Sequence, residues 1–220
     1  MKLENIAKRI SLARQSKKQN IMPYDNFYDR VMAAVKLLDF VEDEKADKEV
    51  RYEARKYLVV ALASGMETYF KRMAQGFIDA GRINKEFRDI LKRDQISLAG
   101  LIDINKKELS LGEIISVSHS LQDLDAVNYF FSRMLGVNNF LKELETIEIE
   151  PENGKKFVLK DNHPDFRVKI AELLDLRHLV VHHEGFKRIL GVDRLLRMAQ
   201  CVFGLVSAAS IYLEEKIPDG

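Results

Sequence analysis

The feature that most constrains the fold is the apolar stretch Met198–Leu213, which reads MAQCVFGLVSAASIYL. It is shorter than the ~20 residues that a membrane-spanning helix needs, and it contains Gln200, Ser207 and Ser210. With its flanks it predicts a helix from about Asp193 to Lys216 that is apolar on nearly all sides. Such a helix belongs in the middle of a helical bundle or in an oligomer interface. We therefore expect other helices around it and no membrane partner.

Helical periodicity recurs along most of the chain, because apolar residues repeat with spacings of three and four. It predicts helices over residues 3–10, after Pro23, from Lys48 to Ala80 and from Pro164 onward. The chain has only 4 Pro and 11 Gly, too few for the turns of an all-β sandwich of this length. We expect an all-α, up-and-down helical bundle in one domain, 1–220, with a helical extension at 1–45 and a less regular insertion at 82–163.

The insertion at 82–163 carries weaker signals. Asn153-Gly154 is a turn signal between two short segments, so we expect a small hairpin of Thr146–Ile149 with Lys156–Leu159. Ser110 and Asp123 are typical N-cap residues. Short helices are expected at Lys85–Arg93, Leu111–Leu121, Asp123–Leu135 and Asn139–Leu144.

Charge and cysteine content exclude some classes of protein. Lys and Arg number 35 and Asp and Glu 34, a net charge of +1, which removes the electrostatic argument for a strongly basic nucleic-acid binder. A local basic helix near the start, with Lys8 and Arg9, is either a solvated face or a surface that contacts phosphates. The single cysteine, Cys201, excludes an internal disulfide. The chain starts without a secretory signal pattern, and we expect a cytoplasmic protein.

The segment Leu176–Gly185, which reads LRHLVVHHEG, concentrates the residues able to carry chemistry. The apolar stripe of the helix from Pro164 continues to positions 177 and 181, so Arg177 stands where the core or an interface is expected. A buried arginine needs an anion such as a carboxylate or a phosphate. His178 and His182 are four residues apart and share a helix face, and His183 follows. Histidine exchanges protons near neutral pH.

Four interpretations of this cluster remain open. It is a set of helix-end caps and salt bridges, a zinc site, part of a cysteine or serine hydrolase, or a site for metal-free RNA cleavage. The zinc-protease motif HEXXH is absent, because Leu179 occupies the position of its glutamate. Cys201 lies in an apolar stretch typical of a core, and no G-x-S-x-G sequence occurs. In metal-free RNA cleavage, histidine moves protons and arginine stabilises the charge on phosphate.

The run from Arg177 to His182 resembles the HEPN motif, in which an arginine and a polar residue precede a histidine four to six residues later. Its place at the end of a helix, before the last helix of an all-α bundle, also fits. The segment from Ala63 to Lys71 is similar to the earlier long helix of several prokaryotic HEPN groups. The resemblance covers roughly 50–81 and 164–216.

The resemblance implies a homodimer in which two motifs form one composite site, and a ribonuclease that needs no metal or cofactor and leaves a 2′,3′-cyclic phosphate. Arg177 would stabilise the scissile phosphate and His182 would be the acid/base group. His178 and His183 would support them, and Glu67 would fix Arg177. On a straight helix Arg177 and His182 are about 140° apart, so a shared cleft completed by a second copy suits them.

This points to a toxin or anti-phage defence effector that cleaves RNA, with an antitoxin or another defence protein as a possible partner. In some HEPN toxins a tyrosine two residues after the motif histidine is modified by the partner. Glu184 stands at that position here, which argues against that mode of control. The alternative is a non-catalytic HEPN module that binds nucleotide or RNA, or that scaffolds a defence complex.

Overall fold

The computed structural model describes residues 23–44, 46–87, 110–150, 155–183 and 191–216. Helix accounts for 78% and strand for 3% of these residues, so the all-α class is confirmed. The elements are α2 (Pro23–Asp43), α3 (Lys48–Asp79), α6 (Leu111–Ser118), α7 (Leu124–Leu135), α8 (Phe140–Leu144), β1 (Glu148–Ile149), β2 (Phe157–Val158), α9 (Leu159–Asn162), α10 (Phe166–His182) and α11 (Val192–Glu215).

The chain clusters into two compact units. Within the described residues, the larger unit comprises 24–44, 46–69, 122–124, 141–150, 155–183 and 191–216, and the smaller unit comprises 23, 70–87, 110–121 and 125–140. The long helix α3 contributes its first part to the larger unit and its last part to the smaller one. The single domain expected over 1–220 stays a prediction.

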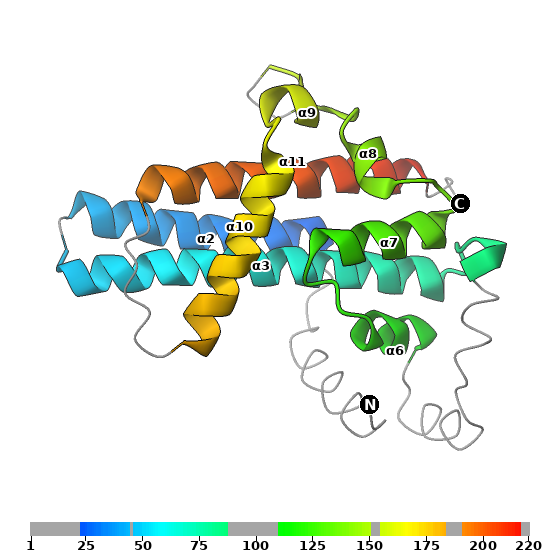
Figure 1. Cartoon of the computed structure of the whole chain (residues 1–220), viewed down its shortest axis with the longest axis horizontal. Helices are drawn as coiled ribbons and strands as arrows, with labels where there is room; N and C mark the ends of the chain where they lie inside the picture. Colours follow the sequence, from blue (N-terminus) through cyan, green and yellow to red (C-terminus); the bar gives the residue numbers. More distant parts are fainter. Residues whose placement is uncertain (1–22, 45, 88–109, 151–154, 184–190, 217–220) are drawn as a thin grey trace. The chain divides into compact units, whose positions relative to one another are not determined.

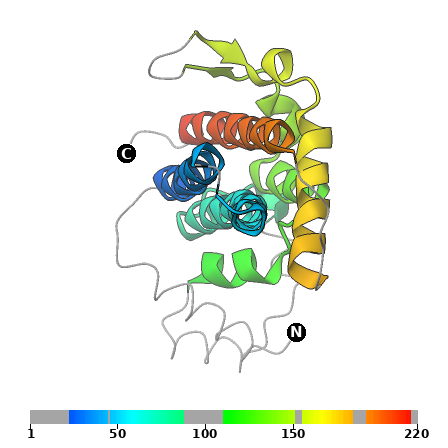
Figure 2. The same ribbon diagram turned by 90° about the vertical axis from the view of Figure 1, so that its left-hand side faces the viewer.

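In the larger unit, α2, the first part of α3 and α11 lie side by side, and α10 crosses them (Figures 1 and 2). The turn between α2 and α3 is held by Arg55, whose guanidinium lies 2.6 Å from the Glu42 carboxylate. At Gly65 of α3 a Cβ atom would come within 3.2 Å of the Phe27 ring. The absence of a side chain at Gly65 therefore lets α2 and α3 approach closely.

The last helix, α11, is the core helix of this unit. Most of its apolar side chains are buried, including Leu195, Met198, Val202, Leu205 and Leu213. Among the described helices it is the one with the length and composition to cross a membrane, but 61% of its most apolar window is buried inside the protein. This burial agrees with the expected position among other helices, and the oligomer interface stays a prediction.

The expected hairpin is confirmed. Strands β1 and β2 pair antiparallel, with Glu148 opposite Val158 and Ile149 opposite Phe157. In the larger unit β1 contacts α11, and the short helix α9 follows β2 directly and also contacts α11. The hairpin and α9 thus lie along one side of α11 (Figure 2).

The smaller unit is organised by an N-cap and an aromatic cluster. Ser110 and Glu113 form a capping box at the start of α6, which confirms Ser110 as an N-cap. Asp79, at the end of α3, accepts hydrogen bonds from the Ser110 hydroxyl and from the Gly112 N–H, both at 2.8 Å. The rings of Phe70, Phe131 and Phe140 pack together, with centroid distances from 4.8 to 6.4 Å.

Expected helix ends shift by a few residues here. The helix expected to reach Leu121 ends at Ser118, and α7 begins at Leu124. Residues 85–87 are helical, and the remainder of the helix expected at Lys85–Arg93 lies outside the described residues.

Gly112→Ala is expected to destabilise the protein by about 1–3 kcal/mol, because the new methyl group would meet the Gln75 carbonyl oxygen and the Asp79 carboxylate. Gly76→Ala in α3 is the matched control. A Cβ at Gly76 has no neighbour within 4 Å, so this change is expected to stabilise the helix by about 0.5–1 kcal/mol. Urea unfolding of both variants measures the two effects, and equal stabilities would contradict the close contact at Gly112.

Candidate functional site

The buried face of α10 differs from the sequence expectation at its C-terminal end. Phe166, Ile170, Leu173 and Leu176 are buried, whereas Val181 is 49% exposed. The expectation that Arg177 and Val181 continue the core stripe is therefore wrong. The four buried positions follow one another at intervals of four, three and three residues, so Leu176 takes the last core position. Arg177 is left half-buried at the edge of the helix face.

Arg177 lines a small pocket of about 240 Å³ in the larger unit. The pocket brings together three of the predicted site residues, since Glu67 of α3 and His178 of α10 also line it. Its other lining residues are Ala63, Gln122, Asp123, Leu174 and Asp175. Gln122 donates a side-chain hydrogen bond to the Glu67 carboxylate at 3.3 Å, which orients that carboxylate.

The guanidinium of Arg177 is uncommitted. Within the described part of the chain, Arg177 forms neither a hydrogen bond nor an ion pair, although Glu67 lines the same pocket. A guanidinium carries five N–H donors in a planar fork that suits carboxylate or phosphate. A half-buried arginine with these donors unused can therefore bind an anion.

The pocket itself is acidic. The carboxylates of Glu67, Asp123 and Asp175 line it against the single positive charge of Arg177. These carboxylates offset the charge of the arginine, but they repel a second anion. A phosphate at Arg177 therefore requires further positive charge beyond what one copy of the chain supplies here.

The predicted histidines gather at the C-terminal end of α10. His178, His182 and His183 are all exposed, and the ring centroid of His178 lies 4.7 Å from that of His182 and 6.3 Å from that of His183. His182 is the last residue of α10, and the N–H of His183 caps the carbonyl of Leu179. His178 joins this cluster to the Arg177 pocket, whereas His182 and His183 do not line that pocket.

The remaining candidates from the sequence are the basic residues near the start of the chain, the cysteine and a zinc site. Lys8 and Arg9 lie outside the described residues. Cys201 is buried, and burial raises the pKa of its thiol to about 11, so it remains a protonated core thiol at neutral pH. For the zinc interpretation, the described residues contain no group of three or more His, Cys, Asp or Glu side chains that could hold a metal ion.

Comparison with family models, with curated proteins and with solved structures found no match.

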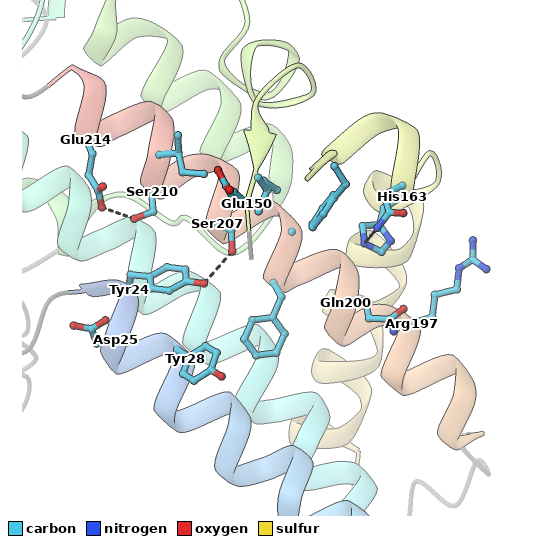
Figure 3. A pocket seen from close by; sticks show the side chains of 16 residues that line it. Tyr24, Asp25, Tyr28, Glu150, His163, Arg197, Gln200, Ser207, Ser210 and Glu214 are labelled. Atoms are coloured by element: carbon cyan, nitrogen blue, oxygen red, sulfur yellow. Dashed lines mark hydrogen bonds between the residues drawn. The ribbon is translucent and has the colours of Figure 1, made fainter. Parts of the chain in front are cut away.

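A larger groove, which sequence reasoning missed, lies along α11 in the larger unit and encloses about 1120 Å³ (Figure 3). One stripe of α11 lines it at helical spacing, with Arg197, Gln200, Gly204, Ser207, Ile211 and Glu214. Facing it are residues of α2, of the hairpin and of α9, namely Tyr24, Asp25, Tyr28, Ile149, Glu150, Phe157, Asn162 and His163. The polar residues Gln200, Ser207 and Ser210 within the apolar stretch were the one sequence signal for this groove. They could not reveal it alone, because the segments that face them lie far away in the sequence.

Two contacts shape the groove. The Tyr24 hydroxyl and the Ser207 hydroxyl share a hydrogen bond of 3.0 Å, which joins α2 to α11. At Gly204 a Cβ atom would come within 2.8 Å of Leu159 Cδ1, so the glycine leaves room for the Leu159 side chain of α9 against α11. The groove thus has a wall of helix α2 on one side and of α9 and the hairpin on the other (Figure 3).

His163 stands at the end of the groove near Arg197, which forms an ion pair of 3.2 Å with Asp165. Burial lowers the pKa of His163 and the positive charge of Arg197 lowers it further, while Asp165 acts in the opposite direction. The folded protein therefore binds a proton at His163 less readily than the unfolded chain does.

Acidification is expected to destabilise the fold through this residue. Because the pKa of His163 is lower when folded, the unfolded state takes up more protons as the pH falls from about 7.5 to about 5.5, and the free energy of unfolding decreases. His163→Gln should reduce that decrease. Urea midpoints of wild type and variant at the two pH values measure it, and identical pH dependences would show that His163 does not contribute.

Proposed function

We propose that this protein is a metal-independent endoribonuclease of the HEPN type, which cleaves RNA at a composite site formed by two copies of the chain. One observation carries the proposal. Arg177, whose guanidinium has no partner among the described residues, lies beside His178, and His178 is in ring contact with His182 at the exposed end of α10. Side chains suited to phosphate stabilisation and to proton transfer thus lie at one helix end, next to the core helix α11 of an all-α fold.

The proposed reaction follows from these groups. A histidine, His182 in our assignment, removes the proton from a ribose 2′-hydroxyl, whose oxygen attacks the adjacent phosphorus. Arg177 stabilises the extra negative charge on the phosphate oxygens. A protonated histidine, from the same cluster or from the second copy, delivers a proton to the departing 5′-oxygen. The products are a 2′,3′-cyclic phosphate and a 5′-hydroxyl.

The need for two copies is supported by charge and by exposure. The Arg177 pocket carries three carboxylates, so a second arginine from another copy would offset their repulsion of phosphate. The face of α10 that carries His178 and His182 also exposes Val168, Ala171 and Asp175. This face is available for a two-fold contact that places two motifs opposite each other.

A second candidate function is a non-catalytic HEPN module that binds nucleotide or RNA, or that holds a defence complex together. The observation that favours it is the position of His182, which does not line the pocket of Arg177. The role as a toxin or defence effector, and an antitoxin or other defence protein as partner, belong to the proposal in both forms.

Cleavage of end-labelled total RNA and tRNA in excess EDTA separates the two candidates. Wild type is expected to cut and to leave cyclic-phosphate ends, whereas Arg177→Ala and His182→Ala should each lose activity by about 100-fold or more, because each removes a group needed in the transition state. Arg167→Ala is the matched control, since Arg167 lies on α10 but pairs with Glu145. Circular dichroism confirms that each variant is folded.

The outcomes decide between the functions. Loss of cutting in the two site variants alone supports the ribonuclease. A wild type that binds RNA but never cuts it supports the binding module. Equal activity of Arg177→Ala and wild type would contradict the assigned site.

The dimer is tested independently of cleavage. At micromolar concentration, light scattering is expected to give about twice the chain mass of 25.4 kDa. Val168→Glu places a charge on the exposed face of α10 and should shift the protein to monomer, since Val168 is 58% exposed there. Val50→Glu on α3, where the valine is 49% exposed, is the matched control and should leave the dimer intact. A wild type that is strictly monomeric would contradict the composite site.

A further inference from the structure

The groove along α11 has an aromatic wall that takes no part in the proposed ribonuclease site. Tyr28 is 45% exposed and its ring lies 5.9 Å from Phe203 and 6.4 Å from Tyr24, all three lining the groove. Phe157 lies across from them on the hairpin. Exposed aromatic faces attract organic cations through the negative face of the ring system.

Charge is distributed unevenly along the groove. Asp25 and Glu214 lie toward the end formed by the start of α2 and the end of α11, Glu150 lies near the middle beside Ser207, and Arg197 and His163 lie toward the other end (Figure 3). Arg197 is already paired with Asp165. The groove as a whole therefore carries more negative than positive charge.

Two of these carboxylates are available to a ligand. Within the described part of the chain Asp25 forms no ion pair, and Glu214 accepts only the 2.8 Å hydrogen bond from the Ser210 hydroxyl. Glu150 shares the Lys156 ammonium, at 3.1 Å, with Glu148. Positive charge in a ligand would therefore be favoured beside Asp25 and Glu214.

The dimensions suit an elongated ligand. From Arg197 to Glu214 the stripe extends about 25 Å along the helix axis, at about 1.5 Å per residue. The volume of about 1120 Å³ is slightly above that of ordinary ligand pockets, which reach about 1,000 Å³. Polar hydroxyl and amide groups, from Ser207 and Gln200, alternate with aromatic surface along it.

From this geometry we infer that the groove along α11 binds a small linear polyamine, a methylene chain that carries two or more ammonium groups. Ammonium groups contact Asp25 and Glu214 at one end of the groove, and the methylene segments extend from there along Tyr28 and Phe203. RNA does not fit this groove, because its phosphates would meet the same carboxylates. The site is separate from the Arg177 pocket, and the inference does not depend on the proposed ribonuclease function.

Calorimetric titration of the full chain with spermidine, in about 100 mM salt to suppress loose charge attraction, tests the inference. Saturable binding at one site per chain is expected. Hexylamine, which has the chain but one ammonium, should bind at least about tenfold more weakly, because it satisfies one carboxylate only. An acetylated tetralysine amide separates a free polyamine from lysine side chains of a protein.

Adjacent residues provide a matched pair of variants. Glu214→Gln keeps the acceptor for Ser210 but removes the charge, and should weaken spermidine binding about fivefold. Glu215→Gln makes the same change one residue further on, outside the groove, and should leave the affinity unchanged. Tyr28→Ala should also weaken binding by about threefold to fivefold through the lost aromatic contact. Thermal unfolding confirms that the variants are folded.

Three results would overturn the inference. They are the absence of saturable spermidine binding, equal affinities of the Glu214→Gln and Glu215→Gln variants, and tighter binding of tetralysine than of spermidine. The last result would assign the groove to a lysine-rich protein segment.

Discussion

Burial of the apolar surface of α11 is the constraint on which the larger unit depends. Helix α11 carries apolar side chains on most of its sides. Each buried methylene contributes about 0.8 kcal/mol to the free energy of folding, so neighbouring elements cover most of the helix circumference. Helix α10, strand β1 and helix α9 contact it, and Phe27 and Tyr28 of α2 pack their rings against Phe203. One stripe of α11, which includes the polar Gln200 and Ser207, is only partly covered and lines the groove. The same packing holds α10 across the unit and leaves the end of α10, with its histidines, exposed.

The two candidate sites suit ligands of opposite charge. In the small pocket Arg177 has no direct partner among the described residues, and the carboxylates around it offset its charge from a distance. Such a site accepts an anion only when additional positive charge arrives, which is why the proposed ribonuclease needs a second copy. In the groove the carboxylates outnumber the cationic side chains, and the aromatic rings add further surface that attracts a cation. A cationic ligand can enter there without any other copy of the chain.

Sequence periodicity predicted the helices well where the local signal is strong. The long α3 and α11 begin and end within one residue of expectation, because a helix of many turns averages over individual residues. Ser110 was identified as an N-cap because a capping box is a local structure. At α10 the pattern failed at one point, since Leu176 rather than Arg177 takes the core position. Which of two adjacent residues faces the core depends on the angle at which helices cross, and no local pattern contains that angle.

The sequence by itself determined the helical class, the buried last helix and the histidine cluster, since His178 and His182 are neighbours on any helix that contains both. Only the tertiary structure decided that Glu67 and Asp123 share a pocket with Arg177, and that Tyr24, Glu150 and Glu214 line one groove. These residues are separated by tens of positions along the chain. Their proximity follows from how helices pack to cover apolar surface, which is a property of the whole fold rather than of any segment.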